Sequence, residues 1–285
     1  MVNFKQLFHI GFMEKYQKLL FLFIAISFQT LASAASVDTI NIYSKAMHKS
    51  SKCVIILPDS YKNGNRFPVV YLLHGYSGDY SDWIKKVPRI KYYTDEFQLI
   101  IVCPDANYNS WYFDSPVDSS IKYETYISTE VPHLIDSLYH TIAEKKSRAI
   151  AGLSMGGQGA LSLALKHPDL FGAAGSMSGV QDLSPWKNKY ELIDVLGDTL
   201  RNNNFSKNSV VNMVKQISSP VPAIIFDCGI SDPFIETNRQ LNSELLELKI
   251  PHDYTERSGT HNWEYWSNSI GYQLMFFYNY FNTGK

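Results

Sequence analysis

The sequence predicts an α/β protein with a mostly parallel central sheet and helices on both faces. Short runs rich in Val, Ile and Leu alternate with segments whose apolar residues recur at helical spacing, and this alternation is typical of βαβ units. Three of the runs are apolar along almost their whole length, as strands buried on both faces are. Because ligands of such sheets bind beyond the carboxyl ends of the strands, functional residues are expected just after each run.

The elements can be placed in order along the chain. Expected strands cover 37–44, 51–58, 67–75, 97–105, 148–154, 172–179, 221–229 and 251–259. The first two read as an antiparallel pair. Expected helices cover 122–142, the segment after Ser154, 234–250 and 262–281. Residues 180–220 are polar and rich in Asn and Ser, and we interpret them as an insertion over the site within one domain that spans 35–285.

Composition limits the class of partner. The chain has 285 residues, a net charge of -1 and 45% hydrophobic residues, which is typical of a globular protein. A charge so close to neutral gives no support for a nucleic-acid partner. The 19 Tyr and 5 Trp will mostly lie in the core, and some of them can line a cleft for a planar or sugar ligand.

The N-terminus has the features of an export signal. Lys15 and Lys18 precede an apolar run over 19–28, and the small residues 32–34 follow it. We therefore expect a signal peptide over 1–34, with Met13 as an alternative start. The apolar run is too short for a transmembrane helix, so no stable membrane insertion is expected after its removal. The predicted location is secreted or periplasmic.

Cysteine and histidine patterns give no sign of a metal or redox site. The three cysteines, Cys53, Cys103 and Cys228, cannot form a fully paired disulfide framework. His133 and His140 are seven residues apart on an expected helix, which is weak evidence for metal binding beside an ordinary surface or core role. No metal and no organic cofactor is expected.

The segment AIAGLSMGGQGAL, residues 149–161, places a serine where a buried strand ends and a helix begins. Gly152 and Gly156 remove side chains that would clash in a sharp turn, so the hydroxyl of Ser154 can stand out from the backbone. The N-terminus of the next helix favours negative charge at the same place. A tight turn with an incidental serine is the simpler alternative, but the strand before and the helix after favour a nucleophile.

A serine nucleophile needs a base and an acid. On this kind of sheet both are expected after the serine, with the acid first. His261 lies in a turn between the last expected strand and the last helix, and we predict that it is the base. The preceding strand offers Asp227 at its end and Asp232 in the loop after it, and we favour Asp232 because it lies further into the loop. Asp227 is expected to brace the loop.

The segment LLHGYSG, residues 72–78, supplies the remaining part of a catalytic site. Gly75 lets the backbone approach a reacting carbonyl, so we expect the main-chain N–H groups of Tyr76 and Met155 to form an oxyanion hole. His74 is expected to orient this loop. In the simpler alternative, Gly75 only terminates the strand.

Taken together, four segments resemble the Putative esterase group of α/β-hydrolases: LLHG at 72–75, GLSMGGQGAL at 152–161, DCGISD at 227–232 and GTHNWEYW at 259–266. That group includes esterase D, S-formylglutathione hydrolases, tributyrin, feruloyl and acetylxylan esterases, and more distantly mycolyltransferases. The resemblance covers about residues 38–282 and implies an α/β-hydrolase fold. It also implies that Ser154 is the nucleophile, Asp232 the acid and His261 the base.

Departures from the group guide the expected substrate. S-formylglutathione hydrolases are cytosolic and usually carry a histidine where this chain has Leu153, whereas this chain has an export signal. Export and a tryptophan-rich rim of Trp111, Trp263 and Trp266 favour an esterase that removes acetyl or feruloyl groups from plant polysaccharide, although each tryptophan can equally be core packing. The expected partner is a small ester or an acylated carbohydrate. The alternatives are an S-formylglutathione hydrolase, a mycolyltransferase-like acyltransferase and a non-catalytic binding protein.

Overall fold

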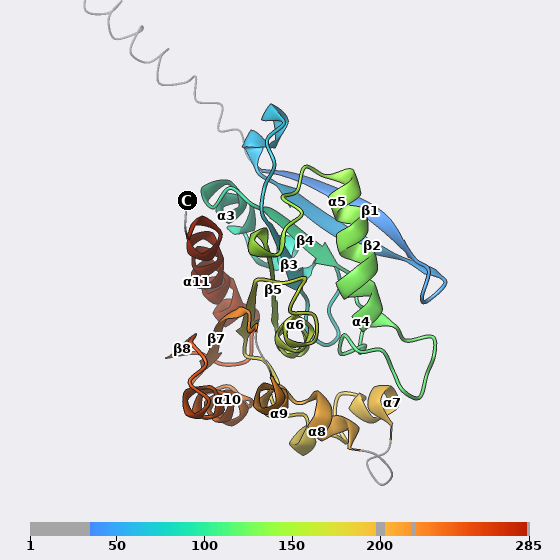
Figure 1. The fold of residues 1–285 in the computed structure, drawn as a ribbon, viewed down its shortest axis with the longest axis vertical. Helices are drawn as coiled ribbons and strands as arrows, with labels where there is room; N and C mark the ends of the chain where they lie inside the picture. The colour runs from blue at the N-terminus through green and yellow to red at the C-terminus, as the bar shows by residue number, and fades with distance from the viewer. Residues whose placement is uncertain (1–34, 198–202, 218–219, 284–285) are drawn as a thin grey trace, which may run out of the picture. The chain divides into compact units, whose positions relative to one another are not determined.

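Eight strands form one sheet in the order β1-β2-β4-β3-β5-β6-β7-β8 (Figure 1). The structure is a computed structural model that describes residues 35–197, 203–217 and 220–283. The expected signal peptide over 1–34 therefore lies outside the described residues. The strands are β1 Ser36–Ser44, β2 Lys49–Leu57, β3 Val69–Leu73, β4 Ile100–Pro104, β5 Arg148–Leu153, β6 Ala173–Met177, β7 Ala223–Gly229 and β8 His252–Arg257.

The sheet is mostly parallel, as predicted. Strand β1 pairs with β2 and β2 with β4 in antiparallel fashion, and every other neighbouring pair is parallel. Strands β3, β4 and β5 are buried along their whole length, which explains why their sequences are continuously apolar rather than alternating. Strand β6 consists mainly of small residues because helices press close on it: a Cβ at Gly175 would lie 2.2 Å from Gln273 Oε1.

Helices cover both faces of the sheet, which confirms the predicted layer arrangement. The helices are α2 Asp82–Lys86, α3 Ile90–Glu96, α4 Tyr123–Thr125, α5 Val131–Leu138, α6 Met155–Lys166, α7 Leu192–Leu196, α8 Asn204–Asn208, α9 Val210–Met213, α10 Ile235–Glu247 and α11 Trp263–Asn282. One core cluster joins the sheet to α2, α3 and α11, and includes Trp83 and Ile270. The other joins it to α5, α6 and α10, and includes Ile135 and Leu241. Figure 1 shows α3 beside α11, and the rings of Phe97 and Tyr278 meet there at 5.7 Å.

Two segments differ from the sequence-based expectation. The helix expected over 122–142 ends at Leu138 and contains a π-helical turn over Tyr126–Glu130. It stops because Tyr139 is extended and Thr141 forms a parallel bridge to Phe67. The stretch between β3 and β4, which carries no expected element, folds into α2 and α3.

The expected insertion over 180–220 contains only short helices in its described part: η4 Ser184–Trp186, α7, α8, α9 and η5 Val214–Gln216. Two further short turns, η1 Asp59–Asn63 and η3 Lys145–Ser147, precede β3 and β5. The three cysteines are buried free thiols. Within the part of the chain that the structure describes, none of the helices has both the length and the apolar character of a membrane span.

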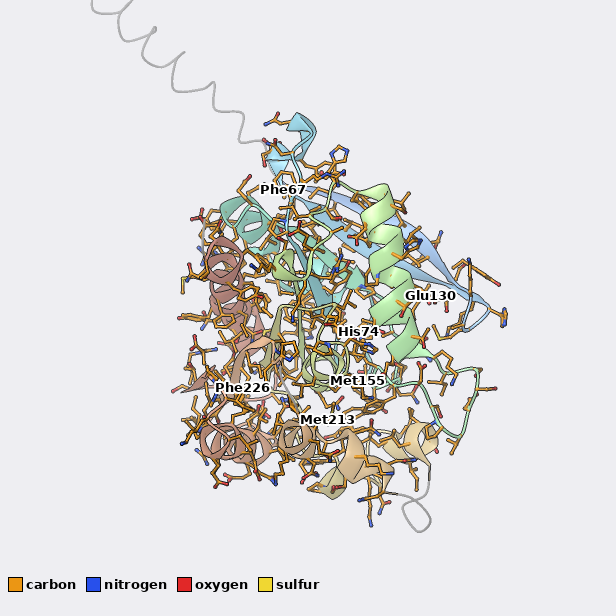
Figure 2. All side chains as sticks on the ribbon, viewed as in Figure 1. Phe67, His74, Glu130, Met155, Met213 and Phe226 are labelled. Atoms are coloured by element: carbon orange, nitrogen blue, oxygen red, sulfur yellow. The ribbon has the colours of Figure 1, made fainter. Side chains whose placement is uncertain are left out.

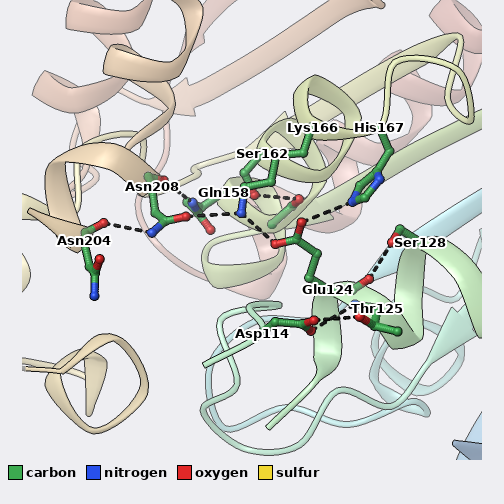
Figure 3. A network of polar contacts seen from close by, with 11 residues as sticks. Asp114, Glu124, Thr125, Ser128, Gln158, Ser162, Lys166, His167, Asn204 and Asn208 are labelled. Atoms are coloured by element: carbon green, nitrogen blue, oxygen red, sulfur yellow. Dashed lines mark hydrogen bonds and ion pairs between the residues drawn. The ribbon is translucent and has the colours of Figure 1, made fainter. Parts of the chain in front are cut away.

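A polar network anchors the far end of α6 to the insertion (Figure 3). Glu124 accepts hydrogen bonds from Lys166 at 2.6 Å and His167 at 3.2 Å, and Lys166 also donates to Asn208 at 3.2 Å. One turn after Ser154, the side chain of Gln158 donates to the Asn208 main-chain oxygen at 2.9 Å. Burial alone would raise the pKa of the Glu124 carboxyl, but the His167 hydrogen bond and the Lys166 charge outweigh it and hold the pKa below its ordinary value.

Candidate active site

Ser154 occupies a strained turn between β5 and α6. Its backbone has φ 54° and ψ -118°, a conformation that a residue with a side chain rarely adopts. The turn requires a glycine on each side of Ser154, because neighbouring backbone atoms pass very close to both positions. A Cβ at Gly152 would lie 2.4 Å from the Gly156 oxygen, and one at Gly156 would lie 2.4 Å from the His74 oxygen. The two glycines therefore have the steric role expected from the sequence.

The side chains of Ser154, His261 and Asp232 form a continuous hydrogen-bonded chain. Ser154 Oγ lies 2.9 Å from His261 Nε2, and His261 Nδ1 lies 2.9 Å from Asp232 Oδ2. An ionised carboxylate only accepts, so Nδ1 carries the imidazole proton and Nε2 is free to accept the serine proton. The residues come from three places: the turn after β5, the loop after β7 and the loop after β8.

Asp232 is almost fully buried, with 2% of its surface exposed. Its second oxygen, Oδ1, accepts the main-chain N–H of Phe234 at 2.9 Å, which fixes the carboxylate plane. The ring of His261 lies between two aromatic rings, with centroids 4.8 Å from Phe234 and 4.8 Å from Trp266. Both contacts are edge-on, so they restrain the imidazole and limit water around it.

Asp227, the other candidate acid, has partners other than His261. It lies on β7 and forms an ion pair with Arg257 at 3.0 Å. Burial raises the pKa of the Asp227 carboxyl, and the Arg257 guanidinium opposes that rise. The structure therefore brings Asp232, and not Asp227, to the histidine.

The two main-chain N–H groups expected at an oxyanion hole flank Ser154. Met155 is the first residue of α6, so its N–H has no partner within the helix. Tyr76 lies in the turn after β3, and its N–H has no backbone partner among the described residues. A Cβ at Gly75 would lie 3.4 Å from Ser154 Cβ, so this turn reaches the serine closely. Figure 2 labels His74 close to Met155, the first residue of α6, and a Cβ at the next residue, Gly156, would lie 2.4 Å from the His74 oxygen.

His74 fixes the peptide that carries the Tyr76 N–H. The imidazole is buried, and burial lowers its pKa, so it is neutral. Its Nε2 accepts the Ala106 N–H at 2.9 Å, which places the proton on Nδ1. That proton is donated to the Gly75 oxygen at 2.8 Å. Because the oxygen and the hydrogen of a peptide point in opposite directions, holding the Gly75 oxygen aims the Tyr76 N–H the other way.

A cavity of about 200 Å³ opens over Ser154. Trp111, Trp263 and Trp266, the three tryptophans expected at the rim, all line it. Trp111 and Trp266 are nearly buried, so they form its walls, and Trp263 is half-exposed at the edge. The lining residues are Gly75, Tyr76, Ser77, Gly78, Asp82, Lys86, Trp111, Leu153, Ser154, Tyr190, Phe234, His261, Trp263 and Trp266.

Sequence reasoning missed several of these residues. Tyr190 comes from the insertion, and its ring contacts Tyr76 at 5.5 Å and Phe234 at 6.2 Å. Trp111 donates its indole N–H to the Tyr190 oxygen at 3.0 Å. Burial and a hydrogen bond with Tyr108 raise the pKa of the Tyr76 hydroxyl to about 12, so this wall is neutral and aromatic. The aromatic character of the insertion near Trp186 was the signal that could have found Tyr190.

Another part of the lining, the polar wall, comes from α2. Lys86 lies over the Trp263 ring at 4.8 Å and pairs with Asp82 at 2.7 Å. No sequence pattern pointed to this wall, because α2 itself was not expected. Within the described residues, no group of three or more His, Cys, Asp or Glu side chains is placed to hold a metal ion.

The arrangement has the parts that acyl transfer through a serine requires. It provides a hydroxyl beside an imidazole, a carboxylate behind the imidazole, and free N–H groups at the start of a helix. The strained turn of Ser154 places this residue in the lining of the cavity. Such a site can form and hydrolyse an acyl-enzyme.

Comparison with known proteins places these features in context. The model of the family described as "Putative esterase" matches residues 44–277. An acetyl esterase from Caldicellulosiruptor saccharolyticus is 27% identical over 252 residues, which cover 81% of this chain and 94% of that protein. A diacylglycerol acyltransferase/mycolyltransferase of Mycobacterium tuberculosis is 27% identical over 246 residues, which cover 73% of this chain and 72% of that protein.

The fold has a close match among solved structures. A ferulic acid esterase superposes with a TM-score of 0.76 and 29% identity, covering 87% of this chain and 99% of that one. The predicted α/β-hydrolase fold is thereby confirmed.

Proposed function

This chain belongs to the Putative esterase family of α/β-hydrolases, and we propose that Ser154, His261 and Asp232 are its catalytic triad. The chain is a serine hydrolase that acts on carboxylic ester bonds. The observation that carries the residue assignment is the unbroken hydrogen-bonded chain from Ser154 Oγ through His261 to Asp232, with 2.9 Å at each step.

The reaction follows from the positions of these atoms. Ser154 Oγ attacks the ester carbonyl carbon while His261 Nε2 takes its proton, and the Asp232 carboxylate stabilises the imidazolium. The N–H groups of Tyr76 and Met155 donate to the carbonyl oxygen as it gains charge, each worth about 3–4 kcal/mol in the transition state. The ester C–O bond then breaks, and His261 returns the proton to the leaving alcohol. Water, deprotonated by the same imidazole, hydrolyses the acyl-enzyme and restores Ser154.

The proposed substrates are acetyl or feruloyl esters carried by plant polysaccharide. The acetyl esterase and ferulic acid esterase relatives support this class. The aromatic wall of Trp111, Tyr190 and Phe234 suits a flat acyl group. The export signal expected over 1–34 supports a secreted or periplasmic enzyme that meets such polymers outside the cytoplasm.

The test is a panel of esters with paired serine variants. Initial rates are measured on p-nitrophenyl acetate and butyrate, methyl ferulate, acetylated xylan and S-formylglutathione, for the wild type, Ser154→Ala and Ser162→Ala. Ser162 lies in α6, the helix that follows Ser154, and its hydroxyl donates to the Gly159 oxygen at 3.1 Å, so its variant controls for the serine-to-alanine change itself. We expect hydrolysis of methyl ferulate or acetylated xylan, lost in Ser154→Ala and kept in Ser162→Ala.

Other outcomes select other functions. Retained hydrolysis in Ser154→Ala would remove the triad assignment. A preference for S-formylglutathione would replace the polysaccharide substrate with a thioester. Acyl transfer to an added sugar with little hydrolysis would support a transferase, and turnover of none of the esters would support a binding protein.

A further inference from the structure

A second ionic contact lies beneath the two loops that carry Asp232 and His261. Asp227 on β7 is 2% exposed, and its Oδ1 is 3.0 Å from Nη2 of Arg257 on β8. Asp227 lies five residues before Asp232, and Arg257 lies four residues before His261. Neither side chain lines the cavity over Ser154, so the mechanism above does not use them.

The pair is joined to α11 by three hydrogen bonds. Ser269 Oγ donates to Asp227 Oδ1 at 2.5 Å, and Gln273 Nε2 donates to Asp227 Oδ2 at 2.9 Å. Arg257 Nη2 lies 2.9 Å from Ser269 Oγ. The guanidinium also contacts the ring of Tyr272 at 4.7 Å. Strands β7 and β8 and helix α11 are therefore tied together just behind the loops.

The position of β8 depends on such side-chain contacts, because β8 is the edge strand and pairs with β7 alone among the described strands. On one face, Tyr254 stacks on Phe226 at 4.6 Å. On the other face, Asp253 and Thr255 are exposed, and Arg257 is the residue that reaches α11.

A shift of β8 relative to β7 would also move the loops that carry Asp232 and His261. The β7–β8 ladder continues beyond the strands: Ile230 N donates to the Arg257 oxygen at 2.9 Å, and Ser231 N donates to the Gly259 oxygen at 3.0 Å. Asp232 directly follows Ser231, and His261 follows Gly259 after one residue, Thr260. A shift of about 1 Å between such groups can cost about 100-fold in rate.

We propose that Asp227 and Arg257 are positioning residues that fix β8 against β7 and α11, and so hold His261 in line with Asp232. The inference rests on the proposed catalytic roles of Ser154, His261 and Asp232. A charged pair is well suited to this task because its hydrogen bonds are directional, whereas apolar packing of the same volume would suffice for stability alone.

The test compares Asp227→Asn and Arg257→Gln with a control on the opposite face of β8. Arg239 on α10 pairs with Glu256 on β8 at 2.8 Å but is exposed, so Arg239→Gln removes a strand–helix ion pair of similar kind. Rates on p-nitrophenyl acetate are divided by the fraction of sites that a fluorophosphonate labels. We expect kcat to fall about 10- to 100-fold in the two test variants, with KM nearly unchanged. Arg239→Gln should stay within about twofold of the wild type.

A spectroscopic readout separates positioning from simple loss of stability. The proton on His261 Nδ1 that is donated to Asp232 gives a low-field NMR resonance, and we expect it to shift or broaden in Asp227→Asn but not in Arg239→Gln. Arg257→Lys keeps the charge and should recover part of kcat. If the single variants fail to fold, Ser269→Ala removes one link without leaving a charge unpaired, and a kcat loss of about threefold or more is expected.

Each outcome decides between the two claims. If kcat per labelled site and the low-field resonance stay at wild-type values while only the melting temperature falls, the positioning role is wrong and the triad assignment stands. If the wild-type enzyme is not labelled by the fluorophosphonate, or Ser154→Ala retains hydrolysis, the proposed function itself is wrong.

Discussion

The imidazole of His74 turns back onto the carbonyl of Gly75, the next residue, with Nδ1 2.8 Å from the oxygen. The same oxygen also accepts the Gly78 N–H at 3.0 Å. These two bonds set the orientation of the Gly75–Tyr76 peptide, whose N–H is the proposed oxyanion donor. A side chain outside the cavity lining thereby orients the proposed oxyanion donor.

Removing this imidazole should weaken the oxyanion hole without deleting it. We expect His74→Ala to lower kcat by about 10- to 100-fold, somewhat less than the loss of a whole donor, because the Gly78 bond remains. KM should change little, since the donor acts mainly on the transition state. Steady-state kinetics on p-nitrophenyl acetate measure both. Unchanged kcat would mean that the Tyr76 N–H is oriented by other contacts.

His74 should also make stability depend on pH. Burial lowers the pKa of His74 in the folded state, whereas in the unfolded chain the imidazole has its ordinary pKa of about 6.5. As pH falls below that value, the unfolded state takes up the proton and the folded state does not, so the contribution of His74 to the free energy of unfolding falls by up to about 1.4 kcal/mol per pH unit.

Urea unfolding at about pH 7.5 and about pH 5 measures this effect. The loss of stability on acidification should be smaller in His74→Asn than in the wild type. His133→Asn is the control, because His133 is exposed on α5. An equal loss in wild type and His74→Asn would contradict a neutral, buried His74.

The Asp232 carboxylate sets the tautomer of His261. Asp232→Asn presents an amide to Nδ1, which favours the wrong tautomer, so we expect kcat to fall by about 10,000-fold with little change in stability. Asp253→Asn is the matched control, because it makes the same change at an exposed carboxylate on β8. The fluorophosphonate labelling rate should fall in parallel with ester hydrolysis, and activity above about a tenth of wild type would place the acid elsewhere.

Gly152, which precedes the strained turn at Ser154, has a steric role that can be tested by a single substitution. In Gly152→Ala the new Cβ would meet the Gly156 oxygen at 2.4 Å, so the free energy of unfolding should drop by about 1–3 kcal/mol. Urea midpoints of Gly152→Ala and the wild type measure this loss; equal midpoints would argue that the turn at Ser154 relaxes to accept a side chain.

The sequence patterns located most of the fold because the signal was local. The buried strands at 67–75 and 148–154 were recognised from unbroken apolar runs, and the catalytic candidates from their places after such runs. The strand order was not predictable, because it depends on which distant segments meet. The polar wall was missed for another reason: α2 is only five residues long, too short to display a helical period.

The role of Trp111 shows the same limit at the site. Its indole is buried and bonded to the Tyr190 oxygen, 79 residues away, and its backbone has a positive φ of 53°. From the sequence, a tryptophan in a loop is a candidate for the rim of the cavity. Its place in the cavity wall depends on the packing of the insertion against it. The choice of Asp232 over Asp227 could be argued from loop position, whereas the ion pair that occupies Asp227 could not.

The network at the far end of α6 should stabilise the insertion. Glu124→Gln removes the charge that Lys166 and His167 share, and we expect the free energy of unfolding at about pH 7 to fall by about 1–2 kcal/mol. Because the pKa of Glu124 is depressed in the folded state, its stabilising contribution is present above the ordinary glutamate value and is lost as pH falls through the depressed one. The difference between the variant and the wild type should therefore shrink toward about pH 3, which urea unfolding measures. A constant difference would point to packing rather than charge.

The main-chain amide and the side-chain ring of Tyr76 have two separate proposed roles. Its amide is the proposed oxyanion donor, while its ring lines the aromatic wall. Exchanging the side chain leaves the amide in place, and among the ordinary substitutions only proline deletes it. Evolution or a protein engineer can therefore remodel substrate preference at this position with the rate-enhancing contact left intact. Positions of this kind are favourable starting points for libraries that seek new ester specificities.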